Sequence, residues 1–159
     1  MKGIYIGLGS NLSDPIAQID SAITALDAIN NISVVISSSR YASPPMGPQD
    51  QPDYINAVVE VETSLSPHEL LDKLQQIEQE QGRIRLRHWG ERTIDLDLLV
   101  YANETLADER LTVPHPGVAS REFVLYPLAE IAPNLSIPTL ASMEILLQQC
   151  PINQLKRLS

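Results

Sequence analysis

The chain has 159 residues, 43% of which are hydrophobic, and it carries a net charge of −9. This length suits a single core, so we expect residues 1–159 to form one domain, and no apolar run approaches the roughly 20 residues of a membrane helix. A surface this acidic argues against nucleic-acid binding, which needs a basic footprint, but salt screens exposed charges over about 8 Å, so a locally basic site can still bind a small anion.

The first third of the chain predicts a strand, a helix and a strand. Residues 3–8, GIYIGL, predict the first strand, because the glycines and the polar residues after them do not fit a signal peptide. A turn over residues 9–14 precedes Pro15, with Ser13 and Asp14 as candidate helix caps. Apolar residues then recur at helical spacing, namely Ile16, Ile19, Ile23, Leu26 and Ile29. The β-branched run over residues 32–38 predicts the second strand.

A proline-rich loop separates this part from the next strand and helix. Residues 43–53, SPPMGPQDQPD, form a long, stiffened segment, and a loop of this length is either functional or a rigid connector. Residues 54–63 alternate like a strand. Ser66, Pro67 and Glu69 make a capping box for a helix that we expect to end at Gly82.

With the strand over residues 90–101, the order becomes strand, helix, strand, strand, helix, strand. This order predicts an α+β, ferredoxin-like sandwich with an antiparallel sheet and helices packed on it. Two further helices are expected near residues 120–131 and 142–150. The chain's one cysteine, Cys150, lies in this last apolar stretch, which favours packing over catalysis and fits a reducing cytoplasm.

The strand GERTIDLDLLVY, residues 90–101, carries two like charges on one face. Side chains alternate along a strand, so Ile94, Leu96, Leu98 and Val100 should share the buried face. Asp95 and Asp97 then share the other face, with Cα atoms about 6.5 to 7 Å apart. A divalent cation, or a pair of them, would relieve their repulsion, and oxygen ligands favour Mg²⁺. The alternative is a solvated face whose charges protect a sheet edge.

The flanking residues favour the metal. Four of the chain's 11 Lys and Arg residues fall between Gly82 and Thr93, namely Arg83, Arg85, Arg87 and Arg92. Carboxylates, Mg²⁺ and arginines are the recurring parts of phosphoryl transfer, although the chain has no Walker A motif. Other candidates are the aromatic pair Tyr54 and Phe123, which could stack on a flat ligand, the Asn56 amide, the loop residue His115, and Trp89 among the arginines.

Several ordered segments resemble the 6-hydroxymethyl-7,8-dihydropterin pyrophosphokinase family of folate biosynthesis, and they extend over nearly the whole chain. They are GSNL (9–12), SPPMGPQDQPDYINAV (43–58), HWGERTIDLDLL (88–99), RLTVPHP (110–116) and REFVLYPLAEIAP (121–133). The resemblance implies transfer of the pyrophosphoryl group of ATP to the hydroxymethyl oxygen of the pterin, which leaves AMP, with two Mg²⁺ ions as cofactors.

The resemblance also implies three sets of site residues. The catalytic set is Arg83, Arg92, Asp95 and Asp97, and the two aspartates hold both metals. The pterin set is Ser43, Pro45, Met46, Tyr54, Asn56 and Phe123. The ATP set is Arg83, Arg87, Trp89, Arg92, Leu98, Arg110, Thr112, His115 and Arg121. The arginine loop departs from the family pattern, since it is one residue shorter and has Arg87 in place of a lysine and His88 in place of an arginine, and Pro116 replaces an aromatic residue.

Two alternatives to this transferase remain at the level of sequence. A Mg²⁺-dependent nucleotide hydrolase would use the same carboxylates on water, and a non-catalytic binding domain would use the stiff proline-rich loop. For the transferase we expect a cytoplasmic monomer whose partners are ATP and 6-hydroxymethyl-7,8-dihydropterin, with no nucleic acid and no membrane. The start at Met1 predicts a free-standing enzyme.

Overall fold

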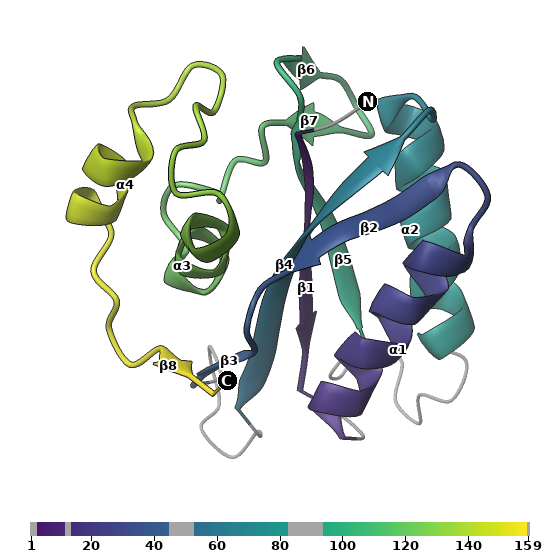
Figure 1. Cartoon of the computed structure of the whole chain (residues 1–159), viewed down its shortest axis with the longest axis horizontal. Helices are drawn as coiled ribbons and strands as arrows, with labels where there is room; N and C mark the ends of the chain where they lie inside the picture. The colour runs from purple at the N-terminus through teal and green to yellow at the C-terminus, as the bar shows by residue number, and fades with distance from the viewer. Residues whose placement is uncertain (1–2, 12–13, 45–52, 83–93, 159) are drawn as a thin grey trace.

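The computed structural model describes residues 3–11, 14–44, 53–82 and 94–158. Figure 1 shows their elements, which are, in chain order, β1 (Ile4–Ser10), α1 (Pro15–Ala28), β2 (Ile32–Ser37), β3 (Tyr41–Ser43), β4 (Tyr54–Thr63), α2 (Pro67–Gly82), β5 (Asp95–Tyr101), β6 (Leu106–Ala107), β7 (Thr112–Val113), α3 (Glu122–Ile131), α4 (Met143–Gln149) and β8 (Lys156–Arg157).

The predicted α+β, ferredoxin-like class is confirmed. The elements β1, α1, β2, β4, α2 and β5 occur in the predicted order, and α3 and α4 lie where the two further helices were expected. The turn predicted at Gly9 is wrong, because β1 continues through Gly9 to Ser10. Strands β3, β6, β7 and β8 were not predicted, since segments of two or three residues carry no readable alternation.

Local side-chain chemistry accounts for the helix starts. In α1, the Asp14 carboxylate accepts a hydrogen bond from the Ala17 N–H at 3.4 Å, with Pro15 at the first helical position. In α2, the Glu69 N–H donates to the Ser66 hydroxyl and the Ser66 N–H donates to the Glu69 carboxylate, which is the predicted capping box. None of the helices in the described ranges is long and apolar enough to cross a bilayer.

Six strands form one antiparallel sheet in the order β5-β1-β4-β3-β8, and β2 pairs with the same strand, β4, as β3 does. Strand β5 therefore lies at one edge and β8 at the other. Strands β6 and β7 pair with each other in a separate two-stranded sheet. One line of register crosses the larger sheet from β5 to β8 and joins Asp95, Gly9, Asn56, Tyr41 and Arg157. Directly opposite residues share a face, so this line lies on a single face of the sheet.

Helices cover both faces of the sheet, and each face has its own apolar cluster (Figure 1). Helices α1 and α2 pack on one face over residues such as Ile6, Val59 and Leu96. Helices α3 and α4 pack on the other face over residues such as Val58 and Leu99. The C-terminal helices thus add a third layer to the two-layer sandwich.

The alternation predicted for β5 fails at one residue. Leu96 and Leu98 lie in the cluster under α1 and α2, as predicted, but Val100 lies in the opposite cluster beside Leu99. The register against β1 shifts between Tyr5 and Ile6, so Leu99 is an extra residue that reverses the facing of the residues after it. Asp95 and Asp97 precede this bulge and keep the predicted common face.

Candidate active site

A cleft of about 990 Å³ opens on the face of the sheet that α3 covers. Its floor comes from β1, β4 and β5, and its walls come from the end of β3, the first turn of α3 and the C-terminal segment. Asp95 and Asp97 line it together with Ser43, Tyr54, Asn56, Arg121 and Phe123. Seven predicted site residues from four elements therefore meet at one cavity.

Two glycines of β1 form the part of the floor beside the aspartates. Gly9 pairs with Asp95 and Gly7 pairs with Asp97, and all four residues line the cleft. Because glycine has no side chain, β1 leaves a trough in the floor of the cleft next to the Asp95 and Asp97 carboxylates. Both aspartates are half-buried, and the aspartate side chains can reach a ligand that lies in this trough.

The trough leads to an amide held in a fixed orientation. Asn56 of β4 is only 6% exposed, and its Oδ1 accepts a hydrogen bond from the Ser43 hydroxyl at 3.1 Å. A Cβ atom at Gly9, the residue opposite, would lie 3.0 Å from the Asn56 Nδ2. The amide is therefore confined between β3 and β1, with its NH₂ group on the β1 side, where it can donate to a ligand in the cleft.

Two aromatic rings come from different layers beside this amide. Tyr54 lies two residues before Asn56 on β4, and Phe123 lies in the first turn of α3, which packs over this face. Both side chains are half-buried and line the cleft. A flat ligand that reached Asn56 would therefore have one ring on its sheet side and the other on its helix side.

His115 is fixed close to the acidic end of the cleft. The backbone N–H of His115 donates to the Leu99 carbonyl at 2.8 Å, and the ring Nδ1 accepts a hydrogen bond from the Gly117 backbone N–H at 3.0 Å. Burial lowers the pKa of His115, and the Arg121 charge adds to this while the Asp97 carboxylate opposes it. The neutral ring therefore carries its proton on Nε2, since Nδ1 is the acceptor.

Arg121 begins α3 at the same end of the cleft. Its side chain lies against Gly117, where an added Cβ would come within 2.6 Å of the Arg121 Nε. Within the ranges the structure covers, the guanidinium makes no ion pair with a carboxylate. The side chain is exposed and faces the cleft, so its charge is available to an anion.

Four of the predicted ATP residues that the structure describes are not among the residues that line the cleft, and they are His115, Leu98, Arg110 and Thr112. The Leu98 side chain is 3% exposed and packs under α1 and α2. Its backbone faces the outer edge of β5, because the Leu96 N–H two residues earlier donates outward to Glu78 at 2.7 Å. Thr112 is exposed on β7, and Arg110, just before it, forms an ion pair with Asp72 at 2.6 Å.

The remaining predicted residues lie outside the described ranges, and they are Pro45, Met46, Arg83, Arg87, Trp89 and Arg92. Over the ranges that are described, no three His, Cys, Asp or Glu side chains group closely enough to hold a metal ion by themselves. The pair Asp95 and Asp97 therefore stands as a two-carboxylate site, which needs further oxygen ligands from water or from a substrate.

Some residues of the cleft were missed in the sequence. Gly7 and Gly9 alternate within GLGS, and two glycines at spacing two in a strand do signal a place where another molecule approaches the backbone. Asn153 and Gln154 of the C-terminal segment also line the cleft, and no local pattern in PINQLKRLS marks them. Only the tertiary structure brings this segment to the site.

Comparison with known proteins identifies the family of the chain. The model of the 7,8-dihydro-6-hydroxymethylpterin-pyrophosphokinase (HPPK) family matches residues 5–133. A 2-amino-4-hydroxy-6-hydroxymethyldihydropteridine pyrophosphokinase of Haemophilus influenzae is 58% identical over 134 residues, which are 84% of this chain and 84% of that protein. The protein of the same name from Pseudomonas aeruginosa is 45% identical over 158 residues, which are 99% of this chain and 98% of that protein.

Solved structures support the fold. The chain superposes on an HPPK-DHPS crystallised in complex with substrates with a TM-score of 0.75 at 14% identity, over 99% of this chain and 47% of that one. An HPPK-DHPS triple mutant of Plasmodium falciparum gives a TM-score of 0.73 at 13% identity, over 94% of this chain and 44% of that one. The chain thus spans less than half of these longer solved chains. With a family model over most of its length and close relatives over nearly all of it, this chain belongs to the 7,8-dihydro-6-hydroxymethylpterin-pyrophosphokinase family.

Proposed function

We propose that residues 1–159 act as a single, monomeric domain that transfers diphosphate from ATP to 6-hydroxymethyl-7,8-dihydropterin, the reaction that gives the family its name. The activity rests on the family and on relatives that cover nearly the whole chain. The assignment of roles to individual residues rests on the cleft. The observation that carries it is that one cavity joins a confined amide between two rings to a pair of carboxylates.

The pterin belongs at the amide end of the cleft. Asn56 and Ser43 present an ordered set of donors and acceptors that suits the polar edge of a heterocycle. Tyr54 and Phe123 enclose its two faces, where stacking adds affinity beyond the buried area. Pro45 and Met46 are proposed to complete this end. The hydroxymethyl group then points along the trough of Gly9 and Gly7 towards the aspartates.

Mg²⁺ belongs at the acidic end, held by Asp95 and Asp97. The donor set fits, because Mg²⁺ binds through one or two carboxylates and takes its other ligands from water and substrate phosphates. We propose two ions, because a pair of metal ions can stabilise both the attacking and the leaving oxygen of a phosphoryl transfer, and Asp95 and Asp97 would hold them. Bound there, the ions supply charge that neutralises the phosphates in the transition state. By holding cations, Asp95 and Asp97 would let this acidic chain bind a polyphosphate that it would otherwise repel.

The phosphates belong beside His115 and Arg121. Arg121 offers a planar fork of donors to phosphate oxygens, and the neutral His115 offers its Nε2–H. Arg83, Arg87 and Arg92 are proposed to add further charge, and Trp89 to close over the bound substrates. The adenine is proposed to lie along the free edge of β5, where the backbone of Leu98 can donate and accept, near Arg110 and Thr112.

The chemistry needs the two substrates held in line. A bond forms between the hydroxymethyl oxygen and the β-phosphorus, the bond from that phosphorus to the bridging oxygen of the α-phosphate breaks, and AMP leaves while the hydroxyl proton is released. Protein residues contribute mainly position, because aligned reactants lose little further entropy on reaction. Asn56 and the rings fix the oxygen, and Arg121 and His115 fix the phosphates.

Incubation with ATP, Mg²⁺ and the reduced pterin tests this function. We expect AMP and the pterin diphosphate to form in equal amounts, and only when both substrates are present. AMP or ADP formed without the pterin would instead identify a nucleotide hydrolase. Pterin binding without any nucleotide product would identify a non-catalytic binding domain.

A further inference from the structure

The C-terminal segment, residues 152–158, reaches back across the sheet to the cleft. It lies beyond residues 5–133, which the family model matches. Asn153 and Gln154 line the cleft together with Ser43 and Pro44, and both side chains are exposed. Their amides are thus the polar groups that the segment presents to a ligand at this end.

Backbone pairing anchors the segment immediately beyond these two residues. Strand β8 pairs antiparallel with β3, with Lys156 opposite Ala42 and Arg157 opposite Tyr41. The Leu158 N–H donates to the Arg40 carbonyl at 2.8 Å, and Leu155 is 7% exposed. The amides of Asn153 and Gln154 therefore extend from an anchored base.

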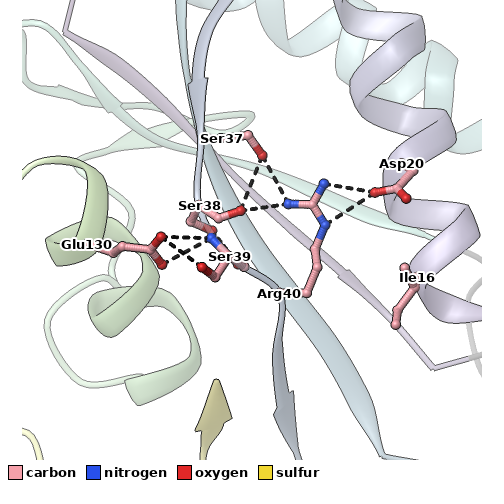
Figure 2. Close-up of a pocket in the computed structure, with 7 residues that line it drawn as sticks. All are labelled: Ile16, Asp20, Ser37, Ser38, Ser39, Arg40 and Glu130. Atoms are coloured by element: carbon pink, nitrogen blue, oxygen red, sulfur yellow. Dashed lines mark hydrogen bonds and ion pairs between the residues drawn. The ribbon is translucent and has the colours of Figure 1, made fainter. Parts of the chain in front are cut away.

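Arg157 adds a side-chain anchor on the cleft face of the sheet. Its Nε donates to the Ser39 hydroxyl at 3.1 Å, and its NH2 donates to the Glu130 carboxylate of α3 at 3.4 Å. Glu130 also accepts from the Ser39 N–H at 3.0 Å and from the Tyr41 hydroxyl at 2.7 Å. Figure 2 shows Glu130 directed at Ser39, beside an Arg40 that is itself held by Asp20.

Arg157 lies on the same cross-strand register line as Asn56, whose amide is proposed to bind the pterin. Arg157 pairs with Tyr41, and Tyr41 pairs with Asn56 across the next strand. Two residues beyond Tyr41, Ser43 donates the hydrogen bond that orients the Asn56 amide. A shift of β3 would move Ser43, and β8 with Arg157 holds β3 from its outer side.

We propose that the C-terminal segment is part of the substrate site: Asn153 and Gln154 contact the heterocyclic substrate, and Arg157 is a positioning residue that holds β3, and thereby Ser43 and Asn56, in register. The proposal rests on the pterin pyrophosphokinase function given above. It adds a specificity element that lies outside the residues matched by the family model.

The contact role is tested with the double variant Asn153→Gly, Gln154→Ala in the full chain. Asn153 has a φ of 55°, which glycine adopts without strain, and both side chains are exposed, so we expect the melting temperature of the variant to stay within about 2 °C of that of the original chain. Loss of one or two polar contacts should weaken equilibrium pterin affinity about 3- to 10-fold, while the KM for ATP stays within about twofold. Equal pterin affinity in a folded double variant would overturn the contact role.

The positioning role is tested with Arg157→Ala against Lys156→Ala. Each change removes one positive charge from β8, but the Lys156 side chain points to the other face and makes no side-chain bond in the described part of the chain. We expect the KM for the pterin to rise at least threefold only in Arg157→Ala, with the KM for ATP unchanged and with partial recovery in Arg157→Lys. Equal effects of the two alanine changes, or a rise in both KM values, would overturn it.

These outcomes distinguish a failure of the proposed function from a failure of the role of the C-terminal segment. If the original chain forms no AMP with ATP and the pterin, the proposed function fails, whatever the variants do. If the original chain is active and the C-terminal variants match it in pterin affinity, only the role of the segment fails.

Discussion

Replacement of Gly9 by alanine should change the pterin affinity of the protein and the stability of its fold in opposite directions. The new Cβ would lie 3.0 Å from the Asn56 Nδ2, so this amide must yield by a few tenths of an ångström. Asn56 is 6% exposed and is held by Ser43 at 3.1 Å on its β3 side, so the push from β1 presses the amide against Ser43 and turns its NH₂ group away from the direction in which it can donate to a ligand. A hydrogen bond contributes about 0.5 to 1.5 kcal/mol net, which corresponds to a loss of pterin affinity of about 2- to 13-fold.

Folding should respond in the opposite direction. Alanine in a strand is about 0.5 to 1 kcal/mol more favourable than glycine, because the unfolded glycine chain has more freedom to lose. We therefore expect Gly9→Ala to melt at the same temperature as the original chain or higher, and yet to bind the pterin more weakly.

Calorimetric titration of the pterin, paired with thermal unfolding, makes the measurement. Gly7→Ala is the matched comparison, because it adds the same methyl group to the trough but meets only the Leu99 side chain, at 3.4 Å from the methyl groups, and does not press on Asn56, so we expect it to lose less pterin affinity than Gly9→Ala. The reasoning is refuted if Gly9→Ala binds the pterin as tightly as the original chain, or if both alanine variants lose affinity equally.

Three further changes test other parts of the site. Asp97→Ala should fold normally, keep pterin affinity within about threefold and lose on the order of 10³ in single-turnover rate, and a near-normal rate would reject its role in holding Mg²⁺. Gly117→Ala should displace the Arg121 side chain, whose Nε would lie 2.6 Å from the new Cβ, and so raise the KM for ATP several-fold while pterin affinity is retained, as Arg121→Ala should too. Burial alone would raise the pKa of Glu130, but hydrogen bonds from Tyr41 and Ser39 and the Arg157 charge outweigh it, and the pKa lies below its ordinary value of 4.5. The ionised Glu130 therefore stabilises the fold at pH values above 4.5, and this contribution is lost as the pH falls below 4.5 towards the lowered pKa. Denaturant titrations from pH 7 to pH 3 should therefore converge for the original chain and Glu130→Gln, and curves that stay parallel would contradict this.

The sequence predicts those parts of the fold that periodicity and capping specify. The spacing of apolar residues from Ile19 to Leu26 and the capping box at Ser66 locate α1 and α2, and alternation locates β4. The common face of Asp95 and Asp97 comes from the same rule. These features depend on neighbours within a few residues, so a single segment of sequence contains the information.

The features that were missed depend on partners far along the chain. Val100 changes face because a register shift against β1 makes Leu99 an extra residue, and nothing in DLDLLVY alone marks that shift. Strand β8 exists because β3 pairs with it, and Lys156–Arg157 has no strand pattern of its own. The predicted site shows the same division, since Asn56 and Phe123 are adjacent only after α3 has packed on the sheet.

The line of register that crosses the sheet makes strand spacing a molecular ruler. From Asp95 through Gly9 to Asn56 there are two inter-strand steps, and at about 4.8 Å each they separate the backbone of the carboxylate from that of the amide by roughly 10 Å. Hydrogen-bonded strands resist stretching far more than loops do, so the pairing of β5, β1 and β4 fixes the distance between Asp95 and Asn56. Evolution can alter the walls and rims of the cavity freely, but the span that a substrate must bridge changes only in whole strands.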